Sequence, residues 1–118
     1  MTIGPHISRK FDQELEDVRH RVLAMGGLVE QQIQDALKAL MEGDGQLAEF
    51  VLTKDHQINA MEVSIDEECV HILAKRQPAA IDLRFVFAVI KTITDLERIG
   101  DEAERIARMA LHLIDNGC

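Results

Sequence analysis

The stretch at residues 81–114, IDLRFVFAVIKTITDLERIGDEAERIARMALHLI, repeats its apolar residues in strict heptads. Alternating steps of three and four residues place them on one face of a single long helix. Valine, isoleucine and leucine fill the first half of this stripe and glycine and alanine the second, so neighbouring helices are expected to approach more closely toward the C-terminal end. The stripe consists of Val86, Val89, Ile93, Leu96, Gly100, Ala103, Ala107, Ala110 and Ile114.

A second helix is predicted over residues 8–42, where apolar side chains recur at the same spacing for about eight turns. Ser8 is its expected cap, and the glycines at positions 43 and 45 are its expected end. Gly26 and Gly27 interrupt its middle, which predicts either a bend or another backbone that approaches closely. The apolar positions are Phe11, Leu15, Val18, Val22, Met25, Val29, Ile33, Ala36 and Leu40.

A third helix is predicted over residues 46–76, with a break or kink near residues 53–55, where the phase of its apolar pattern slips. Pro78 suits the first turn of the helix at 78–115. Three long helices with short connections and no alternating strand pattern predict an all-α chain, an antiparallel bundle that forms one domain over residues 1–118. The apolar positions at 46–76 are Leu47, Val51, Ile58, Met61, Ile65, Cys69 and Ile72.

The composition agrees with a small helical domain and excludes several functional classes. The chain has 118 residues, 47% of them hydrophobic and only 3% aromatic, which favours helix packing over a sheet sandwich. A net charge of −8 disfavours nucleic acid and anionic membrane surfaces as partners. No apolar run approaches the roughly 20 residues that a membrane helix needs. Cys69 and Cys118 show no CxxC spacing, so the reducing cytoplasm is the expected compartment.

Two carboxylate pairs stand out when the residues are placed at 100° intervals around their helices. Glu62 falls inside the apolar arc of its helix and Asp66 lies at the edge of that arc. Glu97 flanks Ile93 in the heptad stripe, and Asp101 repeats the Glu-x-x-x-Asp spacing. Because partly buried like charges are costly unless something positive compensates them, these pairs suggest a metal cation as their ligand.

Other interpretations of these residues stay open at this level. A purely structural bundle would neutralise the carboxylates with Lys91, Arg98, Arg105 or Arg108. A di-iron or other carboxylate-bridged metalloprotein would use Glu-x-x-His motifs, but Glu68-x-x-His71 points away from the apolar arc and has no second copy that faces the core. No catalytic triad, reactive Cys–His pair or phosphate-binding glycine loop occurs, so no enzymatic activity is expected.

Three stretches carry a specific resemblance to a known family: MGGLVEQQI at 25–33, MEVSIDEECVHILAKRQPAAIDLRFV at 61–86 and DLERIGDEAERIA at 95–107. They resemble the PhoU family, the accessory proteins of phosphate-specific transport, over nearly the whole chain. Members of that family contain two tandem three-helix bundles, and this chain is similar to the first of them.

The resemblance implies a cytoplasmic negative regulator of phosphate uptake and of the phosphate regulon. Such a regulator couples the ATPase subunit of the phosphate ABC transporter to a PhoR-like sensor histidine kinase. The family's metal-binding acidic motifs correspond here to Glu62, Asp66, Glu97 and Asp101, with Mg, Mn, Fe or Zn as candidate ions. A chain with one bundle leaves apolar surface unburied, so a homo-oligomer is expected.

Overall fold

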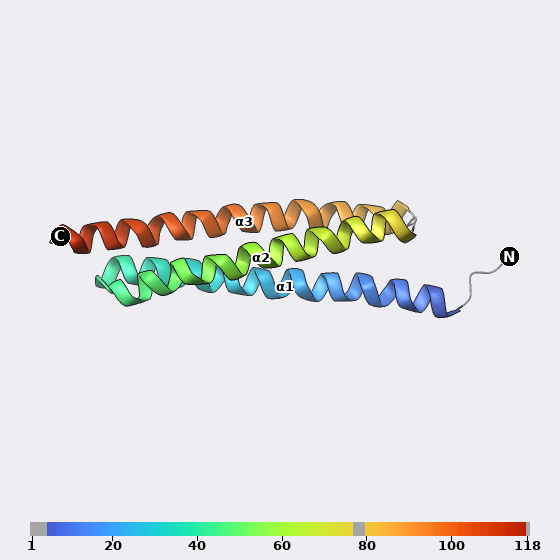
Figure 1. Cartoon of the computed structure of the whole chain (residues 1–118), viewed down its shortest axis with the longest axis horizontal. Helices are drawn as coiled ribbons and strands as arrows, with labels where there is room; N and C mark the ends of the chain where they lie inside the picture. Colours follow the sequence, from blue (N-terminus) through green and yellow to red (C-terminus); the bar gives the residue numbers. More distant parts are fainter. Residues whose placement is uncertain (1–4, 77–79, 118) are drawn as a thin grey trace.

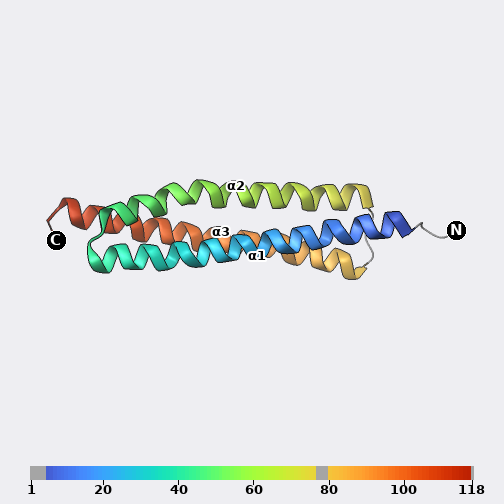
Figure 2. The same cartoon turned by 90° about the horizontal axis from the view of Figure 1, so that it is seen from below.

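The computed structural model describes residues 5–76 and 80–117, and of residues 5–8 it describes only the backbone. Within these ranges the chain forms three long helices and no strand: α1 (Pro5–Glu42), α2 (Gly45–Arg76) and α3 (Ala80–Asp115). The helices run side by side in alternating directions along a rod of 72 × 18 × 17 Å (Figures 1 and 2). The predicted all-α, antiparallel three-helix architecture is confirmed.

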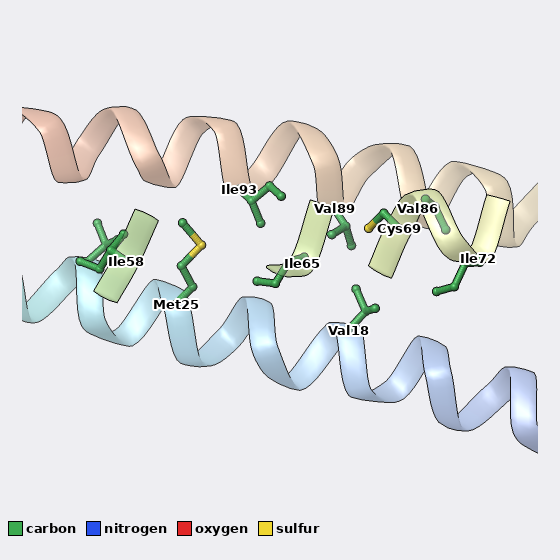
Figure 3. Close-up of a cluster of buried hydrophobic side chains, with 10 residues drawn as sticks. Val18, Met25, Ile58, Ile65, Cys69, Ile72, Val86, Val89 and Ile93 are labelled. Atoms are coloured by element: carbon green, nitrogen blue, oxygen red, sulfur yellow. The ribbon is translucent and has the colours of Figure 1, made fainter. Parts of the chain in front are cut away.

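Two groups of buried side chains hold the helices together. The larger is aliphatic, and Figure 3 shows side chains of α1, α2 and α3 that converge on one interior. The smaller lies toward the α1–α2 turn and the C-terminal part of α3 and consists of Ala36, Ala39, Ala48, Val51, Ala103, Ala107 and Ala110. Alanine therefore occupies the contact where the heptad stripe of α3 changes to small residues, as its sequence indicates.

Gly43 and Asp44 form the turn between α1 and α2. Gly43 has a φ of 67°, a left-handed conformation in which glycine has no steric penalty. The amide N–H of Asp44 donates to the carbonyl of Ala39 at 3.0 Å, which is the closing bond of a Schellman motif. The carboxylate of Asp44 then accepts from the N–H of Leu47 at 3.0 Å and caps α2. The predicted end of the first helix is confirmed.

Two details differ from the expectations. Helix α1 begins at Pro5, so Ser8 lies inside it and is not its cap. Helix α2 runs without interruption through residues 53–55. The expected break therefore does not occur, and Asp55, which lies where the phase of the apolar pattern slips, is itself buried with 6% exposure. Pro78 lies outside the described residues.

The glycine pair in α1 does not mark a close helix contact. A Cβ atom placed on Gly26 or Gly27 would meet no heavy atom within 4 Å outside the backbone of its own helix. Helix α1 continues through both positions. Of the two alternatives, a closely approaching backbone is therefore excluded.

Among the described residues, no helix is both long and apolar enough to cross a bilayer.

Candidate functional site

Antiparallel packing of α2 against α3 places the predicted carboxylates along one side of this helix pair, but within the described residues no three of the four bring ligand atoms within 4.8 Å of one another. Glu62 and Glu97 are half-buried, whereas Asp66 and Asp101 are exposed at the edge of the helix pair. The electrostatic influence of Asp101 reaches both Glu97 on its own helix and Glu62 on α2. Together with two further carboxylates these residues form what we call the acidic strip: Asp55, Glu62 and Asp66 of α2 and Glu97, Asp101 and Glu104 of α3.

Burial and mutual repulsion raise the pKa values of two of the predicted ligands. The pKa of Glu62 is raised first by desolvation and then by the negative charges of Asp66 and Asp101. The pKa of Glu97 is raised by desolvation, by a hydrogen bond shared with Asp101 and by the charges of Asp101 and Glu62. Ionisation of Glu62 and Glu97 at the centre of the acidic strip is therefore unfavourable. A bound cation would stabilise their ionised form.

The basic side chains of α3 do not neutralise this centre. Lys91 and Arg98 both pair with Asp95, at 3.6 and 4.0 Å, and Arg105 pairs with Glu102 at 3.3 Å. Arg108 donates to Glu104 at 3.0 Å, at one end of the strip. Among the described residues, no ion pair within 4.0 Å involves any of the four predicted ligands, which are Glu62, Asp66, Glu97 and Asp101.

The donor chemistry of the strip fits a hard cation. A shallow groove between α2 and α3 is lined by Glu62, Asp66 and Glu67 together with Ile93 and Thr94. Carboxylate oxygens are preferred by Mg²⁺, Mn²⁺ and Fe³⁺, whereas tight Zn²⁺ sites normally include imidazole or thiolate. If such an ion were bound, it would supply positive charge to the helix pair, and carboxylates of the acidic strip would hold it.

The buried end of the acidic strip was missed by the sequence interpretation. Asp55 is only 6% exposed and accepts hydrogen bonds from Gln32 of α1 at 3.4 Å and from Asn59 at 3.3 Å. Desolvation and a hydrogen bond with Glu104 raise the pKa of Asp55, and the same bond lowers the pKa of Glu104. The seven-residue spacings from Asp55 to Glu62 and from Glu97 to Glu104 could have revealed this extension.

A second polar cluster links the other end of α2 to α1. Glu14 accepts two hydrogen bonds from Arg76, at 2.8 and 3.1 Å, and His71 lies 3.8 Å away. Ligand atoms of Glu14, Glu68 and His71 all lie within 4.8 Å of one another. Glu68 and His71 thus meet α1 at the edge of the bundle, away from the acidic strip. This placement does not support a di-iron site in the bundle core.

Replacing Glu14 with glutamine is expected to lower the thermal midpoint at neutral pH, because the paired hydrogen bonds with Arg76 lose their charge. The hydrogen bonds from Arg76 hold the pKa of Glu14 below its ordinary value of 4.5, so the stabilisation is present above pH 4.5 and is lost as the pH falls through the lowered pKa. Circular dichroism between pH 7 and pH 3 measures the thermal midpoints of the unaltered chain and of the Glu14→Gln variant, and their difference is the quantity compared. An equal difference at every pH would contradict the assignment, and Glu30→Gln, which changes an exposed carboxylate of the same helix, is the control.

The thiol of Cys69 belongs to the core and is not a nucleophile. Its side chain is completely buried, and desolvation raises its pKa to about 11. Because the thiolate is the reactive form, the residue is inert at neutral pH.

Comparison with known sequences places these features in a family. The model of the PhoU domain matches residues 22–110. The chain is 58% identical over 112 residues to the phosphate-specific transport system accessory protein PhoU homolog of Pseudomonas aeruginosa, covering 95% of this chain and 46% of that protein. It is 52% identical over 111 residues to the phosphate-specific transport system accessory protein PhoU of Escherichia coli. That match covers 94% of this chain and 46% of that protein.

Solved structures agree with the sequence comparison. The crystal structure of PhoU from Pseudomonas aeruginosa superposes with a TM-score of 0.88 at 58% identity, over 91% of this chain and 51% of that chain. The crystal structure of the phosphate transport system regulatory protein PhoU from Streptococcus pneumoniae gives a TM-score of 0.83 at 38% identity. That match covers 92% of this chain and 51% of that chain. The chain therefore spans about half the length of the relatives that it matches.

Proposed function

Because the chain belongs to the PhoU family, we propose that it is a non-enzymatic regulator of phosphate homeostasis that acts in the cytoplasm. In this role it couples the ATPase subunit of the phosphate ABC transporter to a PhoR-like sensor histidine kinase. It restrains phosphate uptake and kinase signalling when phosphate is ample. The observation that carries the proposal is the match over nearly the whole chain to proteins named for phosphate-specific transport.

The chemistry of the described residues supports binding in preference to catalysis. The carboxylates of the acidic strip sit on rigid helices, and Glu62 and Glu97 retain their repulsion without an ion pair. We assign Glu62, Asp66, Glu97 and Asp101 as ligands of a metal ion, with Mg²⁺, Mn²⁺ or Fe³⁺ preferred over Zn²⁺ because all donors are oxygens. A carboxylate-bridged metal store is the second candidate function, and it is favoured by the same uncompensated charge.

The chain is also expected to self-associate. Val63, Val70 and Phe87 are each more than half exposed, and the chain spans about half the length of its relatives. A second copy would cover apolar surface that a single bundle leaves in water. Light scattering at tens of micromolar is expected to give at least twice the chain mass of 13.3 kDa. A monomeric mass at that concentration would contradict the proposal.

Complementation tests the regulatory role. A host that lacks its own PhoU-family gene and carries a phosphate-starvation reporter is expected to regain repression in phosphate-rich medium when it expresses this chain. Repression should disappear on transfer to phosphate-free medium. A reporter that stays fully active although the folded chain accumulates would count against the regulatory function and favour a metal store.

A further inference from the structure

We propose that a second copy of this chain packs against the outward face of α1, centred on Gly27, with the two α1 helices antiparallel. The proposal rests on the self-association proposed above and identifies the surface through which it occurs. The spacing of the residues on this surface places them within about 100° of arc on the side of α1 that faces away from the core. The surface, which we call the glycine face, consists of the exposed residues Glu16, Leu23, Gly27, Gln34, Leu37, Lys38 and Met41.

The glycine pair has no structural cause within the chain. Gly26 and Gly27 lie inside the long helix α1, where glycine is destabilising relative to alanine. A Cβ atom on either residue would meet no atom of α2 or α3 within 4 Å, so alanine would fit at both positions. Glycine instead leaves the backbone of α1 bare on the outside of the bundle, where a helix of another molecule can approach closely.

Exposed apolar side chains border the bare backbone. Leu23 is 62% exposed and Leu37 is 44% exposed, four residues before and ten residues after Gly27. The inner face of the same helix is already buried in the core, so α1 is apolar on two sides. In an antiparallel pair, Leu23 of each copy packs beside Gly27 of the other, and this contact removes leucine from water.

The charges on the glycine face suit a two-fold contact. Glu16 and Lys38 lie eleven residues before and eleven residues after Gly27. A two-fold axis at Gly27 therefore sets Glu16 of each copy opposite Lys38 of the other, which gives two ion pairs. Among the described residues Lys38 has no ion pair within 4.0 Å. The contacts of Glu16 with Arg19 and His20 use only its Oε1.

This charge pattern distinguishes the glycine face from the exposed apolar surface of α2. Val63 lines a groove together with Glu62, Asp66 and Glu67. Two copies that met there about a two-fold axis would set carboxylates against carboxylates, and like charges oppose association. The charges therefore favour the glycine face as the contact between copies.

Exchange of charges tests the pairing. Glu16→Lys and Lys38→Glu each set like charges opposite one another in a pair of identical chains. At low ionic strength each variant alone should associate roughly 10-fold more weakly than the unaltered chain in sedimentation equilibrium. An equimolar mixture of the two variants restores both ion pairs and should regain the affinity of the unaltered chain. Glu67→Lys and Lys91→Glu change exposed charges of α2 and α3 and should each associate as the unaltered chain does.

The variant Gly27→Gln tests the close approach. Its thermal midpoint, measured by circular dichroism at a concentration where the chain is monomeric, should rise because glutamine favours a helix more than glycine does and meets nothing inside the bundle. Its association should weaken by roughly 10-fold or more because the added side chain keeps the two helices apart. Ala60→Gln, at an exposed site of α2, is the control and should leave association unchanged.

The outcomes separate this surface from the proposals on which it rests. A mixture of the charge variants that associates no more tightly than its components would overturn the glycine face, and so would a Gly27→Gln chain that associates as tightly as the unaltered one. Self-association would stand in both cases. An unaltered chain that is monomeric at tens of micromolar would overturn self-association and the glycine face together, whereas complementation tests the regulatory role separately.

Discussion

Replacing Ile65 with alanine is expected to lower the free energy of unfolding by about 2–5 kcal/mol, as buried large-to-small changes do. Ile65 is 1% exposed and lies at the centre of the aliphatic cluster, between Met25 of α1 and Val89 of α3 (Figure 3). The deletion removes packed methyl and methylene groups and leaves a cavity between rigid helices that can collapse only in part. Urea unfolding at a fixed protein concentration, followed by circular dichroism, measures the change.

A matched control distinguishes the effect of burial from the effect of replacing isoleucine with alanine as such. Ile81→Ala removes the same atoms from a side chain that is 82% exposed. Its effect should stay within about 0.5 kcal/mol, as for most surface substitutions. A loss below about 0.5 kcal/mol for Ile65→Ala would contradict the assignment of the core.

The double replacement Glu97→Lys with Asp101→Lys is expected to abolish repression of phosphate-starvation genes in phosphate-rich medium. It reverses the charge at the centre of the acidic strip, where a cation or a positively charged partner surface would bind. The bundle should stay folded, because these carboxylates repel each other and Glu62 in the native state. A reporter assay in a host that lacks its own family member measures the effect.

An equal change of charge elsewhere is the control for this experiment. Glu30→Lys with Glu49→Lys alters exposed carboxylates of α1 and α2 outside the acidic strip. This control protein should repress the reporter as the unaltered chain does. Normal repression by the Glu97 and Asp101 variant would show that the strip takes no part in signalling.

The helices and most of the core follow from patterns that are local to each segment. Val86, Ile93 and Ala107 share a face of α3 because a heptad repeat on one helix determines which side is apolar. Half-burial of Glu62 and Glu97 was predictable for the same reason, since their angular position needs no knowledge of the other helices.

The contacts between helices could not be predicted in the same way. The slip in phase near residues 53–55 predicted a break or kink in α2, yet Asp55 is buried there and interacts with Gln32 and Glu104 on the other two helices. Glu14 and Arg76 meet although 62 residues separate them. Such pairings depend on the relative register of packed helices, which the periodicity of one helix does not specify.

Calorimetry of the purified chain with the cytoplasmic part of the PhoR-like kinase, and separately with the transporter ATPase, tests the central claim most directly. Each titration is made with and without Mn²⁺ after circular dichroism has established the helical fold. The account predicts saturable binding to at least one partner and its loss in the Glu97→Lys, Asp101→Lys variant. A folded chain that shows no binding to either partner in both conditions would contradict its role as a regulator of phosphate signalling.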